Sequence, residues 1–209
     1  RIRNGLTRTR GEQHRSLRAL LIPKLQRRAV EAMAPRIAAI VDAQLASWQP
    51  GTTIDLGREA KRLSLRVSSE LLFGITEGES GDRIGALLGE FMRRSYRLDV
   101  LATRWLAPLP GTPYAALERN AQRLEFESRR LIGSRRATPG DDLLSTLIGA
   151  RDAGLAGLGD DELVGQVTLL FGASYETTAQ ALLFTLALLA QSPHEARALR
   201  SALGGESTV

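Results

Sequence analysis

The chain has 209 residues, of which 43% are hydrophobic and 24% charged, a composition typical of a soluble globular protein and unlike that of a disordered one. It contains no cysteine, which excludes a disulfide, a thiolate metal site and a cysteine nucleophile within these residues. No signal peptide is evident, and no stretch reaches the roughly 20 apolar residues that a membrane span needs. We therefore expect no membrane span, and we predict a cytoplasmic location, with which the lack of cysteine is compatible.

The net charge of +5 is unevenly distributed, because the first 30 residues contain nine Lys or Arg residues and a single acid, Glu12. Such a block can contact nucleic acid, an anionic lipid surface, an acidic protein or the carboxylates of a cofactor, and it can equally be a solvated face. It is also similar in composition to a mitochondrial transit peptide. Charge alone leaves these alternatives open.

Apolar residues recur at helical spacing along almost the whole chain. The expected helices lie near residues 11–29, 37–48, 60–72, 80–107 (one or two helices), 114–136, 143–148, 160–191 and 193–203. Pro35 is expected near the start of the second helix and Gly74 just after the third. Asp160 or Asp161 is expected to cap the long helix. Residues 52–56, Thr-Thr-Ile-Asp-Leu, form the only convincing β-like segment.

The predicted long helix is about 45 Å in length and apolar on most sides, so we expect it to pass through the middle of a domain. Its apolar surface is interrupted at residues 172–178, Gly-Ala-Ser-Tyr-Glu-Thr-Thr. Threonine hydroxyls can bond to the carbonyl one turn back and bend a helix, and an acid beside an alcohol can relay protons or hold a water molecule. A polar stripe facing a neighbouring helix or solvent explains the same residues, and spacing alone does not decide between the two.

Residues 173–178, Ala-Ser-Tyr-Glu-Thr-Thr, resemble the central-helix motif of the cytochrome P-450 family of haem-thiolate monooxygenases: Ala or Gly, Gly, any residue, Asp or Glu, Thr, then Thr or Ser. The resemblance implies that Glu176 and Thr177 are a catalytic acid–alcohol pair that delivers protons during oxygen activation. It also implies that Ala173 lines the haem face and that Thr178 bonds to the backbone. Ser174 departs from the motif, because the family usually has glycine there, and its side chain would narrow the oxygen groove or add a hydrogen bond.

A second match lies in the basic segment, where His14 and Arg18 are four residues apart and share one helix face. Taken alone, two such residues are ordinary surface residues. The segment nevertheless resembles a pattern of bacterial family members, and the matching residues are Gly11, His14, Arg18, Leu20, Leu21 and Pro23. The resemblance implies that His14 and Arg18 hold the propionates of the haem.

The family also needs a Glu-x-x-Arg helix and a cysteine loop after the central helix, and the sequence ends before either. Residues 59–62 and 127–130 fit Glu-x-x-Arg but precede the central helix, so we interpret them as chance charge pairs. The sequence begins at Arg1, and we expect a single incomplete domain over 1–209, mainly α, equivalent to the C to J helices of the family and using haem b (iron protoporphyrin IX). We expect this fragment alone to be inactive, because haem iron without its axial thiolate cannot make the family's oxidant. Its central helix would also expose apolar faces.

For an intact parent, the resemblance implies insertion of one oxygen atom of O2 into a small apolar organic substrate, with electrons from a ferredoxin or a flavin reductase. The residues expected to form an apolar roof over that substrate are Phe91, Met92, Tyr96, Leu98 and Trp105. The alternative is an all-helical ligand-binding or DNA-binding regulator with a basic N-terminal segment. The first 50 residues contain no tight turn between two short helices, so we expect no nucleic-acid partner.

Overall fold

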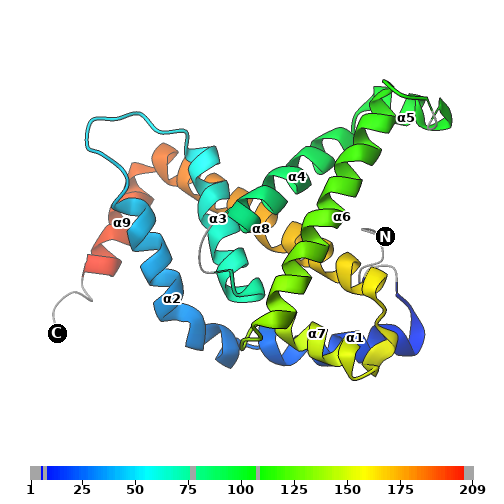
Figure 1. The fold of residues 1–209 in the computed structure, drawn as a ribbon. Coiled ribbons are helices and arrows are strands. Elements are labelled where there is room, and N and C mark those ends of the chain that lie inside the picture. The colour runs from blue at the N-terminus through cyan, green and yellow to red at the C-terminus, as the bar shows by residue number, and fades with distance from the viewer. Residues whose placement is uncertain (1–5, 7–8, 76–78, 107–108, 205–209) are drawn as a thin grey trace.

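The computed structural model describes residue 6 and residues 9–75, 79–106 and 109–204, and the elements in these ranges are all helical (Figure 1). They are α1 (Gly11–Leu25), α2 (Arg27–Leu45), α3 (Leu56–Phe73), α4 (Glu79–Ser95), α5 (Leu98–Ala102), η2 (Arg104–Leu106), α6 (Pro113–Ala137), α7 (Leu143–Asp152), η3 (Leu155–Gly157), α8 (Asp160–Gln191) and α9 (Pro193–Gly204). The predicted mainly α fold is confirmed. None of these helices is long and apolar enough to cross a membrane.

Helix α8 passes behind α3 and α6, whereas α1 and α7 lie together at the bottom of the view and α4 and α6 extend side by side toward α5 (Figure 1). The buried half of α8 is its N-terminal half, where Leu163, Val164, Val167 and Phe171 are 0% exposed. Phe171 stacks on Phe73 at the end of α3, with ring centroids 3.8 Å apart. The predicted central helix therefore does run through the core, but only for part of its length.

Several local predictions were wrong. Gly159, rather than Asp160 or Asp161, is the N-cap of α8, and its backbone N–H donates to Glu162 Oε2 at 3.1 Å. Residues 52–55 form no strand, and no strand lies elsewhere in the described residues to supply partner hydrogen bonds. Asp55 instead caps α3, because its Oδ1 accepts from the backbone N–H of Arg58 at 3.0 Å and Leu56 is already helical.

Pro35 lies inside α2 rather than near the start of that helix. A proline removes one helical hydrogen bond, but Pro35 and Glu31, one turn before it, are both exposed, so water can satisfy the freed carbonyl of Glu31.

The first predicted helix, near 11–29, is divided in two, because Gln26 is extended (φ −69°, ψ 153°).

An ion pair between the half-buried Arg135 and the buried Asp142 joins α6 to the start of α7, beside the end of α3. Arg135 Nε donates to Asp142 Oδ2 at 2.7 Å, and Asp142 also caps α7 by accepting from the backbone N–H of Ser145 at 2.9 Å. Burial acts to raise the pKa of Asp142, but the hydrogen bonds from Arg135 and Ser145 outweigh it, so the pKa lies below its ordinary value. The Arg135 guanidinium fits here because Gly74, with φ 63°, ends α3 without a side chain.

Replacing Gly74 by Ala should destabilise the fold by at least about 1–2 kcal/mol, because an L-residue is strained in this left-handed conformation. The new Cβ would also collide with Arg135 Nη2, so the guanidinium would have to move away from Asp142. Urea unfolding would measure the change. Gly133→Ala is the matched control: that glycine is inside α6 with nothing within 4 Å of an added Cβ, so we expect a gain of about 0.5–1 kcal/mol. Equal effects of the two substitutions would show that neither the left-handed backbone nor the space beside Arg135 requires glycine at position 74.

Candidate functional site

The polar segment of α8 keeps its helical backbone, and its hydroxyl groups bond to carbonyls about one turn back. Thr177 Oγ1 donates to the carbonyl of Ala173 at 2.8 Å, and Thr178 Oγ1 donates to that of Ser174 at 2.8 Å. The predicted backbone bond of Thr178 is confirmed. Ser174, which replaces the expected glycine, donates to the carbonyl of Phe171 at 3.2 Å and is half-buried. Each hydroxyl is therefore satisfied by its own helix.

Helix α3 covers one side of this segment through small side chains. Gly57, Ala60, Ser64 and Ser68 recur every three or four residues along α3, and the last three are buried. Ser64 Oγ donates to the backbone carbonyl of Tyr175 at 2.8 Å, across 111 residues of sequence. Because small residues allow two helices to approach closely, α3 can contact the backbone of α8 here.

Glu176 is turned toward α3, where its Oε1 forms an ion pair with Lys61 Nζ at 3.0 Å. The same oxygen accepts from Gln180 Nε2 at 3.2 Å. Burial acts to raise the pKa of Glu176, but Lys61 and Gln180 outweigh it, so the pKa lies below the ordinary value of 4.5. The carboxylate is therefore held ionised and in a fixed position near neutral pH.

The neighbouring Tyr175 packs against α4. It is 5% exposed, and burial, together with the charge of Glu176, raises its pKa to about 12. A Cβ on Gly89 of α4 would lie 3.4 Å from the Tyr175 hydroxyl, and one on Gly172 would lie 3.5 Å from Leu88. Tyr175 is thus a neutral packing residue between α8 and α4, whereas Glu176 is held by α3.

The remaining side of α8 is uncovered. Residues spaced by three or four along it are exposed, and we call them the open face of α8: Ala173, Thr177, Ala181, Phe184 and Leu188. Phe184 is 65% exposed and Leu188 63%. The expectation that this helix exposes apolar faces is confirmed. The open face carries one hydroxyl among apolar groups and small residues, so a flat apolar ligand could lie against it.

The predicted carboxylate-binding pair lies on α1. His14 is half-buried and Arg18 is exposed, while Leu17 between them is 0% exposed and anchors the helix. Neither His14 nor Arg18 pairs with an acid within the part of the chain that the structure describes, so both remain available to carboxylates of a ligand. Gln13 on the same helix donates to the carbonyl of Gly157 at 3.2 Å and fixes α1 beside η3.

The predicted site residues therefore form two groups on different helices, Ala173, Glu176 and Thr177 on α8 and His14 and Arg18 on α1. No hydrogen bond or ion pair among the described residues joins the two groups directly. A third residue group that the sequence did not suggest, Lys61 and Ser64 on α3, supports the first. The described residues contain no cluster of three or more His, Cys, Asp or Glu that could hold a metal ion.

The family model for cytochrome P450 matches residues 1–204. Cyclooctat-9-en-7-ol 5-monooxygenase of Streptomyces melanosporofaciens is 32% identical over 199 residues, which are 91% of this chain and 42% of that protein. Pentalenene oxygenase of Streptomyces avermitilis is 31% identical over 93% of this chain and 44% of its own length. Among solved structures, retinoic acid-bound cyanobacterial CYP120A1 aligns with a TM-score of 0.79 at 26% identity, over 95% of this chain and 44% of that one.

The chain belongs to the cytochrome P450 family. It spans less than half the length of the curated relatives that it matches. The alternative of a DNA-binding or ligand-binding regulator is not supported, because the family match extends over nearly all of the chain.

Replacing Lys61 by Gln should raise the pKa of Glu176, because burial raises this pKa and the positive charge that lowers it would be lost. A carboxyl NMR titration would measure this, with Arg62→Gln, an exposed neighbour on α3, as the control. Since the pKa of Glu176 in the fold lies below its ordinary 4.5, the pair stabilises the protein above that pH and the stabilisation is lost as pH falls through the lowered value. An unchanged pKa in Lys61→Gln would show that the ion pair does not hold the carboxylate ionised.

Proposed function

We propose that this chain forms the oxygen-activating part of a haem-dependent monooxygenase, an enzyme that inserts one oxygen atom of O2 into an apolar organic substrate. The observation that carries the proposal is the open face of α8, on which Thr177 stands beside an ionised Glu176. A proton-handling pair next to an uncovered apolar surface suits a reaction in which a flat cofactor and oxygen lie against the helix.

The cofactor we propose is haem b. Its two carboxylates would be held by His14 and Arg18, which have no acid partner among the described residues, and its flat face would lie against Ala173, where a small side chain leaves room. Haem bound in this way supplies iron for the binding and reductive activation of dioxygen. The 209 residues contain no cysteine, so a thiolate ligand to the iron cannot come from them, and we propose that they lack monooxygenase activity on their own.

The role of this chain in the reaction would be to move protons. Glu176 is ionised and can accept a proton at Oε1 or Oε2, and the ion pair with Lys61 of α3 holds the carboxylate in place. Thr177 can rotate its hydroxyl away from the carbonyl of Ala173 and donate it toward the open face. Because the Thr177 bond is local and exposed, breaking it costs only about 0.5–1.5 kcal/mol.

We propose a small apolar substrate of the general kind that the names of the two Streptomyces relatives suggest. The residues proposed for its roof lie on or near α4, α5 and η2, and Tyr96, Leu98 and Trp105 are 77%, 83% and 78% exposed. Such uncovered apolar side chains can pack against a substrate or a covering segment. The electron donor, a ferredoxin or a flavin reductase, and the cytoplasmic location stay predictions from the sequence.

In the complete haem-loaded protein, Glu176→Gln and Thr177→Val should each lower the rate of product formation about 100-fold or more, because proton transfer by a placed side chain contributes at least that much. Thr185→Val is the matched control, since Thr185 is also exposed on α8 and its Oγ1 donates to the carbonyl of Ala181 at 2.8 Å. Product would be measured by mass spectrometry, and substrate binding by the change in the haem spectrum. If Thr185→Val loses as much activity as Thr177→Val, the proposed role of Thr177 is wrong.

The haem contacts can be tested separately. His14→Gln combined with Arg18→Gln should speed transfer of haem from the complete protein to an apoprotein acceptor by about tenfold or more, because two charge-assisted hydrogen bonds are lost. Arg15→Gln is the control, since Arg15 is exposed on α1 between the two residues. Equal transfer rates for the double variant and the control would mean that α1 does not hold the propionates.

A further inference from the structure

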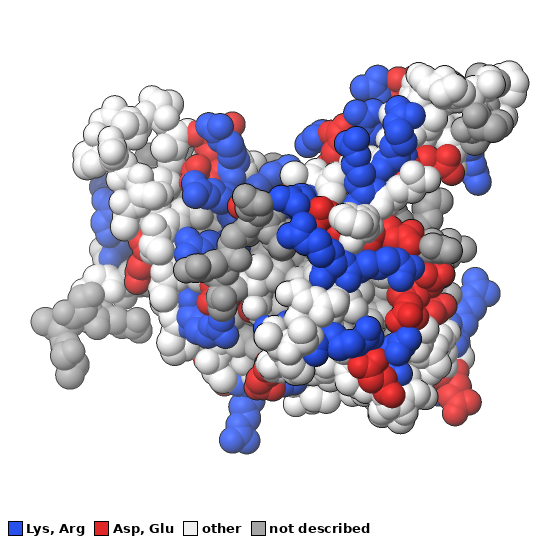
Figure 2. Space-filling view, in the orientation of Figure 1, with Lys and Arg blue, Asp and Glu red and all other residues white. Residues whose placement is uncertain are grey.

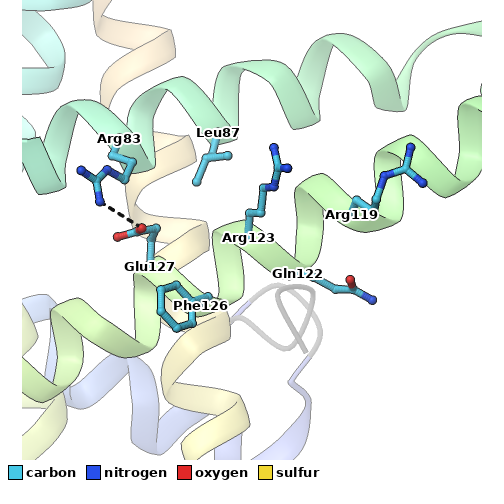
Figure 3. A pocket seen from close by; sticks show the side chains of 7 residues that line it. All are labelled: Arg83, Leu87, Arg119, Gln122, Arg123, Phe126 and Glu127. Atoms are coloured by element: carbon cyan, nitrogen blue, oxygen red, sulfur yellow. Dashed lines mark hydrogen bonds and ion pairs between the residues drawn. The ribbon is translucent and has the colours of Figure 1, made fainter.

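A cleft between α4 and α6 is lined by residues that have no role in the proposed function. Its apolar part has a volume of about 480 Å³ and lies beside Phe126, whereas its polar part has a volume of about 370 Å³ and lies beside Asn120. Leu87, Arg119 and Arg123 line both parts, so the two parts are adjacent along the same pair of helices. Figure 3 shows Arg119 and Arg123 rising from α6 on the side that faces α4, with Leu87 extending from α4 toward α6.

The acids of this cleft already have basic partners. Glu127 accepts from Arg83 at 3.3 Å, and Glu90 accepts from both Arg93 and Arg94. Arg119 and Arg123, by contrast, are exposed and have no acid or hydrogen-bond partner within the described ranges. The cleft therefore carries unbalanced positive charge on two guanidinium groups that are one helical turn apart.

A second, independent feature lies in the polar part. Asn120, between the two arginines in sequence, is only 8% exposed, and its Oδ1 is buried without a hydrogen-bond partner among the described residues. Asn120 lines this part of the cleft, and buried polar atoms are nearly always paired, so a rotation of its side chain toward the cleft would let Oδ1 gain the donor that it lacks. A ligand that carries a hydroxyl or N–H group would supply it.

We propose that this cleft binds an amphipathic organic anion whose phosphate or carboxylate group lies between Arg119 and Arg123 and whose apolar part packs against Leu87 and Phe126. Guanidinium groups suit this role, because they offer paired N–H donors to the oxygens of such anions and remain charged. Phe126 is 65% exposed, so its ring can pack against the apolar part of the anion. The polar end of the cleft, with Asn120, favours anions that also carry a hydrogen-bond donor near the charged group.

The test is calorimetric binding of phenyl phosphate and of benzoate to the complete haem-loaded protein, in which the proposed haem carboxylates occupy His14 and Arg18. At least one probe should bind saturably, and the one that binds more tightly identifies the preferred anion. Arg119→Gln combined with Arg123→Gln should weaken that binding about tenfold or more, because hydrogen bonds to charged groups are lost.

The control is Arg62→Gln combined with Arg66→Gln, because these arginines are also exposed, four residues apart on α3 and without a described acid partner. It removes the same charge and should leave the affinity unchanged. Inorganic phosphate should bind about tenfold more weakly than phenyl phosphate, because it cannot bury apolar surface. The proposal is overturned by the absence of saturable binding of either probe, by equal losses in the two double variants, or by inorganic phosphate binding as tightly as phenyl phosphate.

Discussion

The close approach of α3 to α8 is the contact on which the rest of the structure depends. Small residues on α3 let Ser64 reach the backbone carbonyl of Tyr175, and the stacked rings of Phe73 and Phe171 join the end of α3 to the interior of α8. The aromatic pair is fully buried, and substitutions of buried phenylalanine by alanine typically cost about 3–5 kcal/mol. Because α3 fills one side of α8, Glu176 meets Lys61 there while Thr177 is left on the uncovered side.

This arrangement also explains how a polar segment persists in an apolar helix. An unpaired polar group in a protein interior costs free energy, yet the hydroxyls of Thr177 and Thr178 are bonded to their own backbone and Glu176 is bonded to Lys61 and Gln180. The segment is thus stable without a ligand. The contacts that hold these side chains differ in strength. A threonine hydroxyl can rotate away from its carbonyl, whereas separating Glu176 from Lys61 breaks an ion pair.

Sequence reasoning succeeded for features that are local in the chain. Helical spacing of apolar residues predicted α6 and α8 within one residue at each end, and Gly74 ends α3 as expected. It failed at residues 52–55, because β-branched residues favour extended backbone but cannot show whether a partner strand exists. The sequence motif indicated Glu176 and Thr177, but not Lys61 or Ser64, because those contacts join residues more than 100 positions apart. The regular spacing of small residues from 57 to 68 was the one available signal for them.

Charge provides the clearest case in which sequence and structure give different information. The basic first segment attracts attention by its count of arginines, whereas α4 carries three arginines and three acids and α6 carries six arginines and three acids. Figure 2 shows Lys and Arg gathered over these helices with acids interspersed. The contacts divide the α6 arginines into two kinds. Arg129, Arg135 and Arg136 each pair with a specific acid, and such pairs neutralise one another at short range. Arg123 and Arg119 lie about two and three turns before Arg129 on the same helix, beyond the reach of those acids. Net positive charge is therefore concentrated at the cleft rather than spread along the helix, and only the pairing of individual side chains reveals it.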